Sequence, residues 1–158
     1  MLALFIPGKN NIPELLFTRR SADLRSHAGQ VGFPGGRREE SDESPEATAL
    51  RESYEEIALP SDRVTCLGSL PSLKALDGKL VLPIVAYADI TLNELRPNPE
   101  EVAEIFSIPW TELSVEKNSK VRFNIFGNWR ETPYYEARGQ HIWGLTAIMV
   151  QSMALKDS

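Results

Sequence analysis

Three glutamates, Glu52, Glu55 and Glu56, lie close together in the run RESYEEI that begins at Arg51. On a helix their spacings of three and four residues bring them within about 100° of arc, on one face. Like charges so placed repel one another, by a few tenths of a kcal/mol per pair. Because Mg²⁺ is bound by carboxylate oxygens, this face is typical of a metal site, and a solvated acidic surface is the plainer alternative. Arg51, one turn before Glu55, is expected to hold that side chain by a charge-assisted hydrogen bond.

The residues around the glutamates predict the helix that carries them. Ser44 is a typical N-cap, Pro45 suits the first helical position, and Pro60 disfavours helix in the residue before it, so we expect a helix that ends near Ala58. The expected core-facing side of this helix consists of Ala47, Leu50, Tyr54 and Ile57.

A basic, glycine-rich segment precedes the acidic helix. It carries Arg19, Arg20, Arg25, His27, Arg37 and Arg38. Arginines followed by carboxylates are what a site for a metal-bound polyphosphate requires, although a basic stretch can also be a solvated surface. Arg20 and Arg25 are the candidates for substrate phosphates, with a salt bridge near Asp23 as the alternative, and His27 is expected to form a structural hydrogen bond in the loop.

The remaining patterns predict an α/β sandwich around a mixed sheet, formed by a single domain over residues 1–158. Strands are expected at 2–6, 14–19, 30–33, 64–70, 80–88, 121–126 and 132–137, with a hairpin turn at Asp77-Gly78. Short and long helices are expected at 99–106 and 142–155, and Trp143 is assigned to the core.

Composition excludes several classes of function. The net charge of −5 argues against a general nucleic-acid surface, and no apolar run is long enough to span a membrane. The one cysteine, Cys66, is expected to be a small buried residue on a strand, and nothing indicates an oxidising compartment, so the expected location is the cytoplasm. The sequence leaves open whether the protein is a monomer or a homodimer.

The segment GGRREESDESPEATALRESYEEIAL, from Gly35 to Leu59, resembles the Nudix box, G-x5-E-x7-R-E-U-x-E-E-x-G-U, where U is a bulky aliphatic residue. The distance from Gly36 to Arg51 is one residue longer than in the general box. Ser53 stands at the aliphatic position and Ala58 at the late glycine. The resemblance implies the Nudix α/β/α fold and metal-dependent cleavage of a nucleoside diphosphate derivative.

The preceding segment, LFTRRSADLRSHAGQVGFPGG from Leu16 to Gly36, resembles the signature of the coenzyme A pyrophosphatase branch, with Phe17 at a leucine position. Asp42, six residues after Gly36, and segments near 99–102 and 142–147 also resemble that branch. The implied substrate is coenzyme A or a derivative, cleaved to 3′,5′-ADP and 4′-phosphopantetheine.

The resemblance also implies roles for individual residues. Mg²⁺ or Mn²⁺ would be held by Glu52 and Glu56, with Glu55 as a third or water-mediated ligand and a contribution from the Gly36 carbonyl. Glu52 and Glu101 are alternative general bases, an ordinary acid at a helix start being the other reading of Glu101. The substrate-binding set is Arg20, Arg25 and Arg37. The alternatives are a Nudix hydrolase of ADP-ribose or another nucleoside diphosphate derivative and a non-catalytic nucleotide-sensing module.

Overall fold

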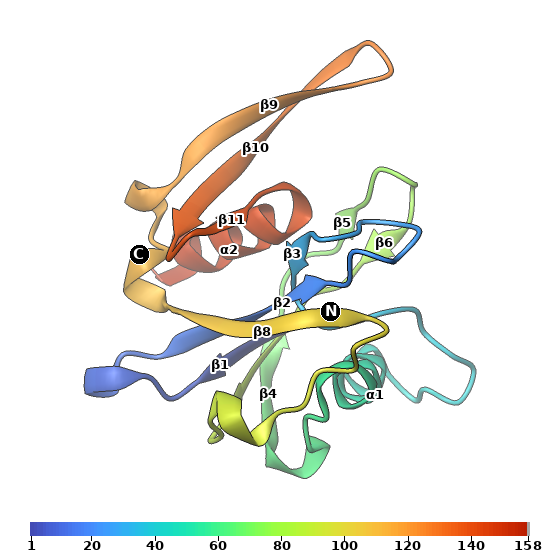
Figure 1. The fold of residues 1–158 in the computed structure, drawn as a ribbon, viewed down its shortest axis with the longest axis vertical. Coiled ribbons are helices and arrows are strands. Elements are labelled where there is room, and N and C mark those ends of the chain that lie inside the picture. The colour runs from blue at the N-terminus through green and yellow to red at the C-terminus, as the bar shows by residue number, and fades with distance from the viewer. Residues whose placement is uncertain (158) are drawn as a thin grey trace.

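The computed structural model describes residues 1–157 and contains two α-helices among eleven strands (Figure 1). The helices are α1 (Pro45–Ile57) and α2 (Gly144–Asp157). The strands are β1 (Leu2–Ile6), β2 (Glu14–Arg20), β3 (Val31–Gly32), β4 (Val64–Ser69), β5 (Leu73–Lys74), β6 (Leu80–Val81), β7 (Ile84–Ala88), β8 (Val102–Pro109), β9 (Ser119–Ile125), β10 (Asn128–Ala137) and β11 (Gln140–Ile142).

A mixed six-stranded sheet forms the centre of the molecule. Its order is β3-β2-β1-β7-β4, with β8 paired to β2, and only the β1–β7 pair is parallel. The β9, β10 and β11 strands form a second, antiparallel sheet, and β5 and β6 form a short hairpin.

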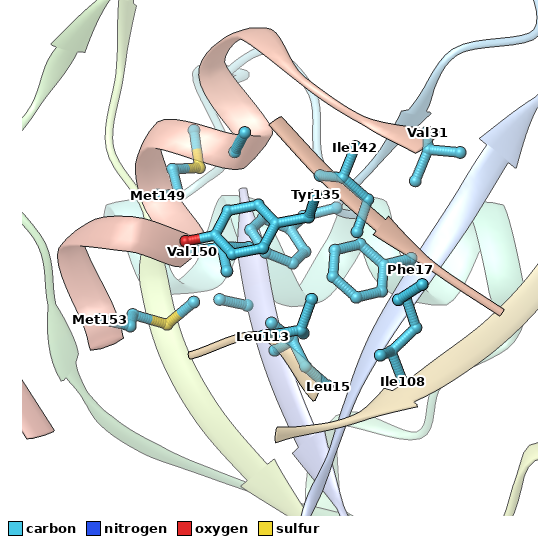
Figure 2. Packing of buried hydrophobic residues seen from close by; sticks show 14 of the residues in the cluster. Leu15, Phe17, Val31, Ile108, Leu113, Tyr135, Ile142, Met149, Val150 and Met153 are labelled. Atoms are coloured by element: carbon cyan, nitrogen blue, oxygen red, sulfur yellow. The ribbon is translucent and has the colours of Figure 1, made fainter. Parts of the chain in front are cut away.

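Each face of the central sheet is covered by one of the helices. Along β1 and β2 successive side chains alternate between faces, as the pleat of a strand requires. Leu2, Leu4 and Leu16 belong to the cluster that also contains Ala49 and Ile57 of α1. The opposite cluster, shown in Figure 2, joins the other face of the sheet to α2 and to β10. Its labelled members are Leu15, Phe17, Val31, Ile108, Leu113, Tyr135, Ile142, Met149, Val150 and Met153. The expected α/β sandwich around a mixed sheet is therefore confirmed.

The predicted helix over 99–106 is wrong, because most of this segment is strand β8. Pro99, Glu100 and Glu101 imitate the first turn of a helix, yet the following residues pair with the full length of β2, from Glu14 to Arg20. This pairing is long-range and cannot be read from local sequence. It brings the start of β8 to the same end of the sheet as Arg20.

The predicted burial of three residues is also wrong. Tyr54 is 64% exposed and Trp143 is 40% exposed, and Cys66 is exposed on β4. The buried stripe of α1 is rotated from the expected one and contains Ala49, Ser53, Glu56 and Ile57. Ser53 fits this stripe because its hydroxyl donates to the Ala49 carbonyl at 2.7 Å, so no polar atom is left unpaired.

Both ends of α1 match the sequence signals. The Ser44 hydroxyl accepts a hydrogen bond from the Ala47 amide at 3.0 Å, and Pro45 occupies the first turn. At the other end Ala58 adopts the left-handed conformation, with φ 55° and ψ 33°, while its amide donates to the Tyr54 carbonyl. A left-handed residue at this position is ordinarily glycine, since a Cβ atom is strained there.

Replacing Ala58 with glycine is expected to stabilise the protein by about 0.5–1 kcal/mol, because the relief of strain exceeds the added entropy of the unfolded chain. Thermal unfolding should show a rise in Tm of roughly 1–4 °C. Ala47→Gly, within the first turn of the same helix, should instead lower Tm by a similar amount. A lower Tm for Ala58→Gly would show that the left-handed backbone at Ala58 is not strained.

Two hairpins stand out from the body of the fold. The β9–β10 pair extends as a long arm, and β5–β6 emerges on the same side of the molecule (Figure 1). Within residues 1–157, no helix has the length and apolar character needed to cross a membrane.

Candidate active site

Arg51 fastens the loop before α1 to the helix. Its Nε and Nη2 atoms donate to the two carboxylate oxygens of Asp42 at 2.9 and 3.0 Å, and Nη2 also donates to the Arg37 carbonyl at 2.9 Å. Asp42 is buried and accepts further bonds from the Glu39 amide and the Thr48 hydroxyl. The paired geometry fixes both groups, since guanidinium and carboxylate match in two parallel bonds.

The remaining nitrogen of Arg51 faces two of the three glutamates. Nη1 lies 3.2 Å from Glu52 Oε1 and 3.3 Å from Glu55 Oε1, which confirms the predicted bond to Glu55. The hydrogen bonds from Arg51 hold the pKa of Asp42 well below its usual range. Sequence reasoning noted Asp42 only as part of a resemblance; its role as the partner of Arg51 was missed, because nothing local pairs residues nine positions apart.

Glu52 and Glu56 face the backbone of the glycine pair that precedes the loop. The Gly35 amide donates to Glu56 Oε2 at 3.3 Å. A Cβ atom built on Gly36 would lie 2.4 Å from the carboxyl carbon of Glu52. Only glycine at position 36 allows the Glu52 carboxylate to approach the backbone this closely, and any larger residue would displace that carboxylate.

The electrostatic environment distinguishes these two glutamates from ordinary surface acids. The pKa of Glu56 is raised to about 7, chiefly by burial and in part by the nearby charges of Glu101 and Glu52, while the hydrogen bond from the Gly35 amide and the charge of Arg20 act in the opposite direction. Burial is also the main cause that raises the pKa of Glu52, again with a contribution from Glu101. A buried and a partly buried carboxylate that repel each other would be stabilised by the positive charge of a cation.

Glu101 and Arg20 are brought to this site by backbone contacts. After α1 ends, the Asn98 amide donates to the Glu56 carbonyl at 2.8 Å, and the Glu101 carbonyl accepts from the Ser21 amide at 2.9 Å. The pairing of β2 with β8 shifts register between Arg19 and Arg20, and such a bulge re-aims side chains. The Nε atom of Arg20 is buried and has no hydrogen-bond partner in the described part of the chain.

The other predicted site residues lie outside this group. Glu55 is exposed and bonded to Arg51, Arg25 is exposed, and Arg37 contributes its carbonyl while its side chain is exposed. No ion pair joins Arg20 or Arg25 to Asp23 in residues 1–157. His27 Nδ1 lies 3.0 Å from Gln30 Oε1, as expected of a structural hydrogen bond.

The donors suit a hard divalent cation. Glu52, Glu56 and the adjacent glycine carbonyls offer only oxygen atoms, which Mg²⁺ and Mn²⁺ prefer, and the mutual repulsion of the carboxylates favours positive charge. Over residues 1–157 no three His, Cys, Asp or Glu side chains are close enough to hold a metal ion together. Glu55 is exposed and bonded to Arg51, so Glu52, Glu56 and the backbone oxygens beside them are the candidate donors.

Gly36→Ala is expected to lower kcat by about 10–100-fold while the protein still folds, because the new methyl group displaces only the flexible end of Glu52. Gly32→Ala is the matched control. A Cβ there would meet only the Thr146 hydroxyl at 3.4 Å, so turnover should stay close to that of the wild type. Equal activity of the two variants, measured at saturating substrate, would show that the position of Glu52 does not matter.

Comparison with known proteins agrees with the resemblance seen in the sequence. A family model described as NUDIX domain matches residues 2–126. The Nudix hydrolase NudL of Pectobacterium atrosepticum, which is described as uncharacterized, is 41% identical over 155 residues, covering 92% of this chain and 76% of the relative. The NudL of Photorhabdus laumondii is 45% identical over 143 residues, covering 90% and 76%.

Solved structures share the fold. The Nudix hydrolase RenU of M. smegmatis superposes with a TM-score of 0.58 at 25% identity, covering 70% of this chain and 69% of that one. The Nudix domain of Shewanella oneidensis NrtR, solved with ADP ribose, gives a TM-score of 0.52 at 22% identity, covering 71% of each chain. The matches to the domain and to the NudL proteins, together with the intact carboxylates of α1, show that the chain belongs to the Nudix family and is a pyrophosphohydrolase of the Nudix hydrolase type.

Proposed function

We propose that this Nudix hydrolase cleaves the diphosphate of coenzyme A or its derivatives to 3′,5′-ADP and 4′-phosphopantetheine. The observation that carries the substrate assignment is the segment from Leu16 to Gly36, which resembles the coenzyme A pyrophosphatase signature and leads directly into the site. Two of its charged residues, Arg20 and Arg25, would contact substrate phosphates, with Arg37 at the start of the following loop.

Arg20 is the best supported of the three. Its guanidinium is close enough to lower the pKa of Glu56, and its Nε atom is buried without a partner. An unpaired buried donor beside the carboxylates is costly unless a ligand satisfies it. A phosphate oxygen of the substrate would do so, because arginine and phosphate form charge-assisted, often paired hydrogen bonds.

We propose Glu52, Glu56 and the Gly36 carbonyl as the groups that hold the cation, with Glu55 binding it through a water molecule. Nudix hydrolases generally use divalent metal cations, and a bound cation supplies positive charge to the diphosphate oxygens and to the attacking water. Mg²⁺ and Mn²⁺ both suit these oxygen donors.

The hydrolysis requires one water and no other reactant. The water oxygen bonds to one phosphorus, the bridging P–O bond on that phosphorus breaks, and the electron pair leaves with the bridging oxygen. The water gives its proton to a carboxylate, for which Glu52 and Glu101 are the candidates. Glu101 is the better base if Glu52 holds the cation, because a carboxylate bound to a cation is less basic.

We also propose that residues 1–158 form a single domain, of which Ser158 lies outside the described residues. In support, α2 packs in the same cluster as β1 and β2, so the last element cannot fold apart from the first ones.

The experiment that tests the substrate is a comparison of kcat/KM for coenzyme A and for ADP-ribose with Mg²⁺. We expect coenzyme A to be preferred by at least about tenfold, which corresponds to one additional well-made charged contact. ADP-ribose is the second candidate because it is the ligand of the NrtR Nudix domain. Turnover of ADP-ribose with coenzyme A untouched would overturn the assignment while leaving the family intact.

A further inference from the structure

Arg19 and Arg20, the last two residues of β2, point to opposite faces of the central sheet, as consecutive strand residues do. Arg20 lies on the α1 face, where its charge acts on Glu56. Arg19 shares the other face with Phe17, two positions earlier, which belongs to the cluster that packs against α2. Arg19 therefore points away from the carboxylates of α1.

The guanidinium of Arg19 joins three separate parts of the chain. Its Nε atom donates to Glu104 Oε2 on β8 at 3.3 Å, its Nη1 atom to the Gly29 carbonyl at 3.4 Å, and its Nη2 atom to the Gln140 side chain on β11. Strand β11 belongs to the second sheet and lies beside β3 (Figure 1). One side chain thus connects the central sheet, the second sheet and the loop between β2 and β3.

The ion pair with Glu104 lies where the ladder between β2 and β8 becomes irregular. Arg19 is directly opposite Glu104, whereas Arg20 is opposite Val102, so the register shifts between the two arginines. Opposite charges that face each other across an antiparallel pair stabilise that register. Arg19 therefore fixes the last regular pair before the residue that is proposed to bind a substrate phosphate.

The bond to Gly29 concerns the loop over residues 21–30. This loop returns to β2 through two backbone bonds at Arg20. The Gly29 amide donates to the Arg20 carbonyl at 3.2 Å, and the Arg20 amide donates to the Gln30 carbonyl at 2.9 Å. The Nη1 atom of Arg19 holds the carbonyl of the same glycine. Because both ends of the loop meet at Arg20, a displacement of either end would move Arg20.

We infer that Arg19 is a positioning residue, which holds Arg20 and the loop over residues 21–30 in the geometry that binds a substrate phosphate. The inference rests on the phosphate contact proposed for Arg20. The Arg19 side chain is 34% exposed, and ion pairs at the surface contribute little to stability. Its three contacts fix geometry instead, because the planar guanidinium presents its donors in set directions.

A double-mutant cycle tests this inference, with KM and kcat measured for coenzyme A and Mg²⁺. Arg19→Gln is expected to raise KM about fivefold and to change kcat by less than about twofold, because a displaced Arg20 weakens the binding of substrate and transition state alike. In a protein that already carries Arg20→Gln, the same change should raise KM by less than about twofold, since the group that Arg19 positions is gone.

Trypsin reports on the loop without any substrate. Arg25 is exposed in the loop, so the rate of cleavage after Arg25 follows how often the loop opens. Arg19→Gln should raise this rate by about threefold to tenfold, and Arg63→Gln should leave it unchanged. Arg63 is the matched control because it also binds a glutamate, Glu94, and a backbone carbonyl, that of Asp89, but precedes β4 at the other edge of the central sheet.

Three results would each overturn the positioning role of Arg19. They are an unchanged KM in Arg19→Gln, the same rise in KM whether or not Arg20 is present, and an unchanged rate of cleavage after Arg25. Cleavage of ADP-ribose with coenzyme A untouched would overturn the proposed substrate alone. The cycle measured with ADP-ribose would then decide the role of Arg19, because that substrate also carries a diphosphate.

Discussion

Glu56→Gln is expected to lower kcat by at least about 100-fold, the loss typical of removing one catalytic electrostatic group. Glu56 is the most deeply buried of the three glutamates, and the Gly35 amide holds it beside Glu52. The variant should fold normally. Because burial and the neighbouring carboxylates together raise the pKa of Glu56 to about 7, its charge destabilises the metal-free protein above that pH, and the neutral amide removes this cost.

The measurement is kcat with saturating substrate and Mg²⁺, together with Tm of the metal-free proteins at pH 8. Tm of Glu56→Gln should equal or exceed that of the wild type. Glu46→Gln, in the first turn of the same helix, is the matched control and should retain full turnover. Near-normal kcat in Glu56→Gln would remove this residue from the site.

Arg51→Lys is expected to lower kcat by about tenfold or more and to lower Tm by several degrees. Lysine keeps the charge but cannot form two parallel bonds to Asp42 while also reaching the Arg37 carbonyl. The buried carboxylate of Asp42 then loses its fixed partner, and the loop that carries Gly36 loses its attachment to the helix. Small displacements of catalytic groups are sufficient for losses of this size.

Arg63→Lys provides the control for this substitution. Arg63 pairs with Glu94 at the surface, where the same change should alter neither kcat nor Tm appreciably. If Arg51→Lys left kcat and Tm as unchanged as Arg63→Lys does, the hydrogen bonds of Arg51 would not be needed, and other contacts would hold the loop. Measuring KM as well separates the two effects, since misplaced catalytic carboxylates lower kcat more than substrate affinity.

The helix of the site could be predicted because its signals are local. Ser44, Pro45 and Pro60 define its ends, and the spacing of the glutamates is visible in the sequence alone. The helical wheel predicted the burial of Ile57 but not that of Ala49, Ser53 and Glu56. Glu56 is buried and Tyr54 exposed, because the helix turns its acidic edge towards the Gly35-Gly36 backbone rather than towards solvent.

The parts that sequence reasoning missed depend on contacts between distant segments. β8 follows residues that resemble a helix start, and its strand character comes from pairing with β2 some ninety positions earlier in the chain. The same pairing brings Glu101 to the carboxylates. The role of Asp42 as the partner of Arg51 also follows only from tertiary structure.

We propose that different parts of the chain determine the reaction and the choice of substrate. In this proposal, α1 and its carboxylates provide for the cation-dependent cleavage of a diphosphate. We propose that selectivity lies in the segment from Leu16 to Gly36, where the register of β2 shifts at Arg20.

Product analysis after incubating the protein with coenzyme A and Mg²⁺, with and without a chelator, tests the proposed activity directly. We expect equal amounts of 3′,5′-ADP and 4′-phosphopantetheine with Mg²⁺, and intact coenzyme A once the chelator has removed the cation. Coenzyme A that remains intact with Mg²⁺ and with Mn²⁺, or the same products in the presence of the chelator, would overturn the proposed metal-dependent hydrolysis.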